Sequence, residues 1–119
     1  MEIMTAVTAR TDGFPPLTHL LYAVLLSLAE EPNHPYELVK RIRERSEGRI
    51  DPGTGSFYSV LAQAERQGLL RERAPGASAR RRVYEIAPLG RKVLAAEAER
   101  LEAQLKATRA ALVADKKRV

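Results

Sequence analysis

The stretch that decides the fold is residues 55–70, GSFYSVLAQAERQGLL. Apolar side chains recur there every three or four positions, which predicts a helix with one face in a core. They are Phe57, Val60, Leu61 and Ala64. Gly68 is the predicted end of this helix, because glycine readily takes the left-handed conformation that closes a helix. A surface helix ordinarily carries Glu and Lys on its outer face, but the outer side chains here are uncharged and able to hydrogen-bond. They are Ser56, Tyr58, Ser59 and Gln63.

The flanking segments predict two earlier helices and a later hairpin. Thr18 can cap a first helix that runs to about Glu31, and Pro35 suits the first position of a second helix that runs to about Ser46. Two short strand patterns, residues 69–73 and 81–87, flank a turn of small residues. Since a two-stranded hairpin is only marginally stable alone, we expect it to pack against the helices. Three helices and a hairpin in this order indicate a mainly α fold with a small β-hairpin, the winged helix-turn-helix.

A long helix is predicted after the hairpin, over residues 88–114, because no Gly or Pro follows Gly90. Its apolar positions alternate in spacings of four and three, which indicates a heptad seam and a dimerisation helix. They are Leu94, Ala98, Leu101, Leu105 and Leu112, with Thr108 in the same series. The alternative is a helix that lies back across its own domain. The predicted organisation is a flexible N-terminal arm (1–16), a DNA-binding winged helix-turn-helix domain (17–87), the dimerisation helix (88–114) and a basic tail (115–119).

Positive charge is concentrated in the middle of the chain. The whole chain has a net charge of +5, but between Lys40 and Lys92 there are 13 Lys and Arg against 6 Asp and Glu. A basic centre suits a surface for a polyanion, because neutralised phosphates release counterions. The alternative is a solvated surface that is merely rich in arginine.

Composition argues against several other classes of protein. The chain contains no cysteine, so disulfides, thiolate zinc sites and cysteine nucleophiles are excluded. Its two histidines, His19 and His34, lie far apart in sequence, and we expect no metal, no cofactor, no catalytic residue and no enzymatic activity. The most apolar stretch, residues 17–29, is shorter than the ~20 residues that span a bilayer. Residues 1–14 do not resemble a signal peptide. We therefore expect a cytoplasmic protein without a membrane partner.

These features together favour double-stranded DNA as the partner. Ser56, Ser59 and Gln63 are short enough to approach base edges in a major groove. Phosphate contacts are expected from residues of the second helix, the third helix and the hairpin. They are Tyr36, Lys40, Tyr58, Arg80 and Arg81. Each assignment has an alternative: the third helix can simply lack charge, the tyrosine rings can belong to the core, and the arginines can form a solvated turn.

Four motifs in order resemble the PadR family of bacterial transcriptional regulators, in the short form with one C-terminal helix. The family's His-Gly-Tyr corresponds to HPY at 34–36, and its Gly-Thr-Leu-Tyr corresponds to GSFY at 55–58. Its Leu-Glu-x-x-Gly-Leu is similar to AERQGL at 64–69, and its wing is similar to RRVYEIAPLG at 81–90. The chain departs from the family pattern at Pro35, Ala64 and Ala87.

The resemblance implies a homodimeric DNA-binding regulator, usually a repressor, that a small aromatic or drug-like effector releases from its operator. It also implies that the C-terminal helix forms the dimer. Two other classes remain open from the sequence alone. One is a protein-interaction module and the other is a ligand-binding winged-helix module, each with incidental affinity for DNA.

Overall fold

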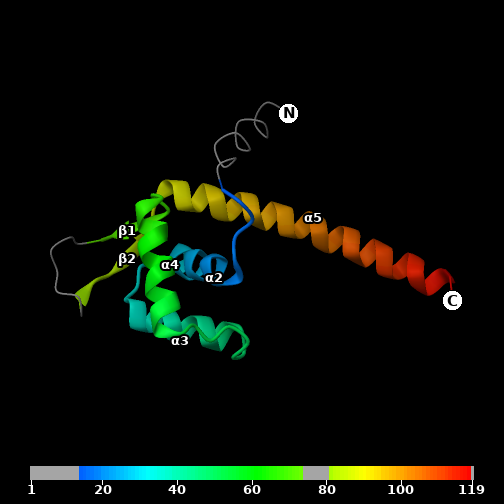
Figure 1. The fold of residues 1–119 in the computed structure, drawn as a ribbon. Helices are drawn as coiled ribbons and strands as arrows, with labels where there is room; N and C mark the ends of the chain where they lie inside the picture. Colours follow the sequence, from blue (N-terminus) through cyan, green and yellow to red (C-terminus); the bar gives the residue numbers. More distant parts are fainter. Residues whose placement is uncertain (1–13, 74–80, 119) are drawn as a thin grey trace.

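The computed structural model describes residues 14–73 and 81–118 (Figure 1). Over these residues the chain forms three short helices, α2 (His19–Glu30), α3 (Pro35–Arg45) and α4 (Thr54–Arg66). A hairpin of β1 (Leu70–Glu72) and β2 (Tyr84–Ile86) follows, and then the long helix α5 (Pro88–Arg118). This is the predicted winged helix-turn-helix order. Most of the predicted N-terminal arm, the turn of the hairpin and Arg80 lie outside the described residues.

The ends of the short helices follow local chemistry that the sequence predicts. The Thr18 hydroxyl oxygen accepts a hydrogen bond from the Leu21 amide at 3.1 Å and caps α2. Pro35 occupies the first turn of α3, where its missing N–H costs no hydrogen bond. Gly68 has a φ of 79°, and the next amide, of Leu69, donates to the Ala64 carbonyl at 2.9 Å. This left-handed turn ends α4 and redirects the chain into β1.

The core lies where α2, α3 and α4 meet the hairpin and the start of α5. Phe57, Leu61 and Ala64 of α4 are almost fully buried, as predicted. Val60, which was expected beside them, is only half-buried, because it lies at the edge of the core by a small pocket that Phe14 and Leu17 also line. The remaining core side chains are mostly aliphatic: Val24, Leu25, Leu28, Leu38, Ile42, Leu69, Leu70, Ile86 and Val93.

The hairpin is shorter than predicted, with three residues in each strand. Leu70 pairs with Ile86, and Glu72 pairs with Tyr84. Leu69 does not begin the strand because its amide is used to close α4. A further antiparallel bridge joins Tyr84 to Asn33 in the linker between α2 and α3. The linker thus extends the hairpin on its β2 side and supplies the support that so short a hairpin requires.

Helix α5 is longer than predicted and projects away from the domain (Figure 1). It continues to Arg118, so residues 115–118, predicted as a separate basic tail, are helical. The physical reason is the absence of any helix-breaking residue in a stretch of good helix formers. The first turns of α5 pack against α2, whereas every side chain from 101 to 116 is exposed. No helix within the described ranges is both long and apolar enough to cross a membrane.

Candidate nucleic-acid interface

Helix α4 presents a polar face to the surface, and its two charged residues, Glu65 and Arg66, are confined to its last turn. Phe57, Leu61 and Ala64 hold its inner side in the core, which leaves the opposite side chains exposed. The four that the sequence singled out are all exposed: Ser56, Tyr58, Ser59 and Gln63. Tyr58 is 54% exposed, and its ring packs edge-on against that of Phe57, with 5.6 Å between ring centroids. Tyr58 is therefore a surface residue rather than a core residue.

Helix α3 exposes a tyrosine and a lysine of the predicted interface. Pro35, Leu38 and Ile42 face the core, while Tyr36 is 79% exposed and Lys40 is exposed. At this exposure the Tyr36 hydroxyl is accessible to a partner. Like Tyr58, Tyr36 is a surface residue, so the alternative that its ring belongs to the core does not apply.

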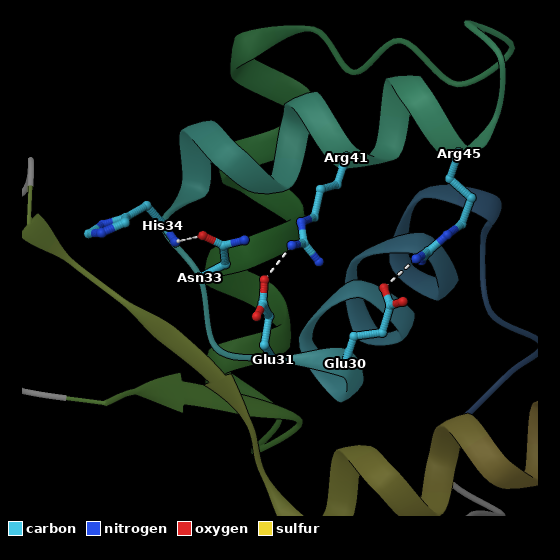
Figure 2. A network of polar contacts seen from close by, with 6 residues as sticks. All are labelled: Glu30, Glu31, Asn33, His34, Arg41 and Arg45. Atoms are coloured by element: carbon cyan, nitrogen blue, oxygen red, sulfur yellow. Dashed lines mark hydrogen bonds and ion pairs between the residues drawn. The ribbon is translucent and has the colours of Figure 1, made fainter.

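The other cations of α3 are engaged in ion pairs. Figure 2 shows Arg41 and Arg45 extending from α3 to Glu31 and Glu30 at the end of α2. Arg43 pairs with Asp51 in the loop before α4. The Arg45 guanidinium holds the pKa of the Glu30 carboxyl below its ordinary value. These arginines fasten α3 to its neighbours, and Lys40 is the cation of α3 that has no ion-pair partner among the described residues.

The hairpin also neutralises much of its own charge. Arg71 donates to the Glu85 carboxylate at 2.8 Å, and Arg82 lies 3.3 Å from the Glu72 carboxylate. Arg81 is exposed and forms no ion pair within the described part of the chain. Charge counted from the sequence therefore overstates the positive surface. Of the predicted phosphate contacts, Lys40 and Arg81 have charges that no acidic side chain neutralises in the described structure. Arg80 lies outside the described residues.

Sequence reasoning overlooked cations near the polar face of α4, of which Arg66 lies in the last turn of the helix itself. Arg49, in the loop between α3 and α4, is exposed and lines the same surface pocket as Ser56. This pocket of about 720 Å³ lies between the start of α2, that loop and the first turn of α4. The sequence could have indicated Arg49 as an interface residue, because it is a basic residue a few positions before the third helix. His19 also lines this pocket, whereas His34 lies at the start of α3. Within residues 14–73 and 81–118, no group of three or more histidine, aspartate or glutamate side chains could hold a metal ion.

The heptad positions of α5 divide into two groups. Leu94 is half-buried and packs on the core of its own domain. Leu101, Leu105 and Leu112 are 40%, 49% and 59% exposed, and Ala98 is exposed. The sequence did not single out Val113, which is 53% exposed in the same region. Part of the predicted seam thus serves the domain itself, and the rest forms an exposed apolar stripe.

Three helices, a hairpin and an exposed polar face on the third helix define a winged helix-turn-helix protein. The family model described as the PadR-like family of transcriptional regulators matches residues 24–96. The chain belongs to this family of transcriptional regulators.

Solved structures agree with this assignment. A conserved protein of unknown function, described as a potential transcriptional factor, is 31% identical, with a TM-score of 0.67 over 82% of this chain and 88% of that one. A transcriptional regulator from Clostridium thermocellum is 26% identical, with a TM-score of 0.67 over 76% and 87%. A PadR family transcription regulator from Clostridium difficile is 20% identical and supports the fold, with a TM-score of 0.67 over 80% and 99%. No curated protein matches the chain.

Proposed function

We propose that the protein is a homodimeric, sequence-specific DNA-binding repressor. The observation that carries this proposal is the hydrogen-bonding outer face of α4, which is uncharged from Thr54 to Ala64. Lys40 on α3 and Arg81 at the hairpin are also exposed and form no ion pair in the described structure. A row of Glu side chains on this face would be repelled by the DNA phosphates. Serine and glutamine side chains can instead exchange hydrogen bonds with base edges.

In the proposed complex, α4 enters a major groove. Ser56, Ser59 and Gln63 read base edges, and residues around them hold phosphates and set the orientation of the domain. The phosphate contacts are Tyr36, Lys40, Tyr58, Arg80 and Arg81. The exposure of the four described members of this set supports the assignment, since each is accessible at the surface.

The exposed stripe on α5 supports a homodimer. The stripe is exposed to solvent in the single chain, and a second copy of the helix would bury its members, Leu101, Leu105 and Leu112. Two copies joined in this way would place two α4 helices on one face of DNA. The operator is then a pseudo-palindrome with half-sites about one helical turn apart.

Repression in the cytoplasm and relief by an effector complete the proposal. A dimer bound at a promoter would block transcription by occupancy, without catalysis or a cofactor. The effector is a small aromatic or drug-like molecule, as the family resemblance implies. A panel of such compounds, titrated into the protein–DNA complex, tests this point, since an effector lowers operator affinity and an inert compound does not.

Selection of bound sequences from a random DNA pool tests the central claim. We expect a pseudo-palindromic consensus, and we expect Gln63→Ala to relax the preference at one position in each half-site. Exposed Gln104 on α5 provides the matched control, since Gln104→Ala removes the same side chain far from α4. A protein-interaction module would enrich no consensus. A ligand-binding module with incidental DNA affinity would bind the pool with equal, salt-sensitive affinity for all sequences.

A further inference from the structure

The linker between α2 and α3 is hydrogen-bonded directly to the hairpin. The Asn33 amide donates to the Tyr84 carbonyl at 3.0 Å, and the Tyr84 amide donates to the Asn33 carbonyl at 2.9 Å. The next residue, His34, adds a side-chain contact, with its Nδ1 atom 3.0 Å from the Arg82 carbonyl oxygen. We call these three contacts the linker–wing clasp. It joins residues that lie 48 to 51 positions apart in sequence.

The side-chain contact determines the tautomer of His34. A carbonyl oxygen only accepts hydrogen bonds, so Nδ1 must carry the hydrogen that is donated to Arg82. A second hydrogen bond steadies the linker, because the Asn33 side-chain oxygen accepts from the His34 amide at 2.9 Å (Figure 2). His34 itself is exposed, so its Nε2 atom is not required by the core.

We propose that His34 is a positioning residue for DNA binding, which acts by holding the hairpin at a set distance from the first turn of α3. This inference rests on the proposed function. Arg81, a proposed phosphate contact, precedes the residue whose carbonyl His34 holds, and Tyr36, another such contact, follows His34 by two positions. Two contacts from separate elements are thereby placed relative to each other before DNA arrives. Prior placement raises affinity because less freedom is lost on binding.

Two of the charged groups near the clasp, Arg82 and Glu31, have ion-pair partners of their own. Arg82 directs its side chain to Glu72, so that only its carbonyl serves His34. Glu31 in the linker pairs with Arg41, and Glu37 lies in the first turn of α3. Burial raises the pKa of the Tyr84 hydroxyl, which keeps that side chain neutral beside the clasp. The partner of His34 in this contact is the uncharged carbonyl of Arg82, so the contact is not an ion pair.

The free protein provides the first test. Nitrogen-15 NMR of the imidazoles distinguishes the Nδ1–H tautomer from the Nε2–H tautomer, and His19→Ala leaves His34 as the single histidine to observe. We expect the Nδ1–H tautomer at pH 8. The Nε2–H tautomer would overturn the clasp. This measurement needs no DNA, so it separates failure of the clasp from failure of the proposed function.

The second test compares three substitutions on the DNA obtained by selection. Asparagine places an amide N–H near the position of Nδ1, whereas glutamine places one near Nε2. We expect His34→Ala and His34→Gln to weaken binding about fivefold, the effect of one neutral hydrogen bond, and His34→Asn to restore most of it. Recovery by glutamine and not by asparagine would instead indicate a direct phosphate contact and overturn the proposal.

A double-mutant cycle with Arg81→Ala completes the test. If His34 positions Arg81, then Arg81→Ala must cost less in the His34→Ala background than in the wild type. Strictly additive losses would contradict a positioning role. Thermal unfolding of each variant shows whether the hairpin is still folded. If the wild type binds no DNA sequence preferentially, the proposed function fails and the positioning role fails with it, whatever the tautomer.

Discussion

At the scale of single residues, Gly90 lies in the first turn of α5, directly against the Leu69 backbone in the turn after α4. A Cβ atom built on Gly90 would lie 2.0 Å from the Leu69 carbonyl oxygen and 2.8 Å from Ile86 Cγ1. The carbonyl cannot move freely, because it accepts a hydrogen bond from the Ala87 amide at 2.9 Å. Glycine is required here for close approach rather than for an unusual φ.

Gly90→Ala should therefore lower the free energy of unfolding by about 3 kcal/mol, as overpacking against rigid backbone does. Urea denaturation of the two proteins measures the change. Gly55→Ala is the matched control, since nothing lies within 4 Å of a Cβ built there. It should leave stability unchanged or raise it slightly, because alanine is the better helix former. Equal stability of the Gly90 variant and the wild type would contradict the packing described.

Glu97 is a buried carboxylate that ties residue 17 to α5. Its Oε2 atom accepts from the Leu17 amide at 2.7 Å, and its Oε1 atom accepts from Arg100 Nε at 2.6 Å. The hydrogen bond from Arg100 is the main reason that the pKa of Glu97 lies below the ordinary 4.5, and the Leu17 amide lowers it further. The ionised form is thus favoured in the folded protein.

Glu97→Gln should reduce the free energy of unfolding by about 1–2 kcal/mol at pH 7. Because the folded pKa is the lower one, the contribution of Glu97 is complete above pH 4.5 and falls as the pH drops through the folded value. The difference between variant and wild type should accordingly shrink in acid. Urea titrations from pH 7 to pH 3 measure it, with exposed Glu99→Gln as control. A difference that stays constant with pH would contradict the role of the charge.

At the scale of elements, the short helices were predictable and the strand lengths were not. Helix α2 begins after Thr18 and α3 begins at Pro35, because capping and the fixed φ of proline act within a few residues. The strand pattern over residues 69–73 was equally clear, yet β1 begins only at Leu70, because the Leu69 amide closes α4 and only the Leu69 carbonyl bonds across the hairpin, to Ala87. Tertiary geometry decides whether a backbone amide between two elements hydrogen-bonds to the helix or to the sheet.

The wing and the third helix should differ in what they contribute to binding. We expect Arg81→Ala to weaken binding to all sequences alike and to lower the slope of log K against log salt by about one, because one phosphate contact is lost. Fluorescence anisotropy at several salt concentrations measures both effects. Arg109→Ala, the same change on the exposed part of α5, is the control. If the slope of log K against log salt were unchanged in Arg81→Ala, Arg81 would not contact a phosphate and the hairpin would not be part of the interface.

At the scale of the whole molecule, the shape is elongated because α5 extends beyond the domain that its first turns pack against. The molecule extends 60 Å along its longest axis, and α5 supplies the projecting part (Figure 1). Leu101, Leu105 and Leu112 lie on that part and remain exposed in the single chain. An apolar stripe of this kind is typical of a surface that a partner covers.

Leu101→Glu should dissociate the proposed homodimer and with it weaken operator binding by at least tenfold, since charges would meet in an apolar seam. Sedimentation equilibrium measures the oligomeric state, and anisotropy measures the affinity. Ala103→Glu adds the same charge on the opposite side of the helix and should leave the dimer intact. A Leu101→Glu variant that still sediments as a dimer would place the interface elsewhere.

The sequence by itself determined the order of the elements, the inner and outer faces of α4 and the family. Those properties follow from helical periodicity, caps and short motifs, all of which act between near neighbours in the chain. Only the tertiary structure decided which cations remain unpaired and how the hairpin is held. Arg45 meets Glu30 across 15 positions, and His34 meets Arg82 across 48. No local pattern marks such pairs, because folding alone brings them within hydrogen-bonding distance.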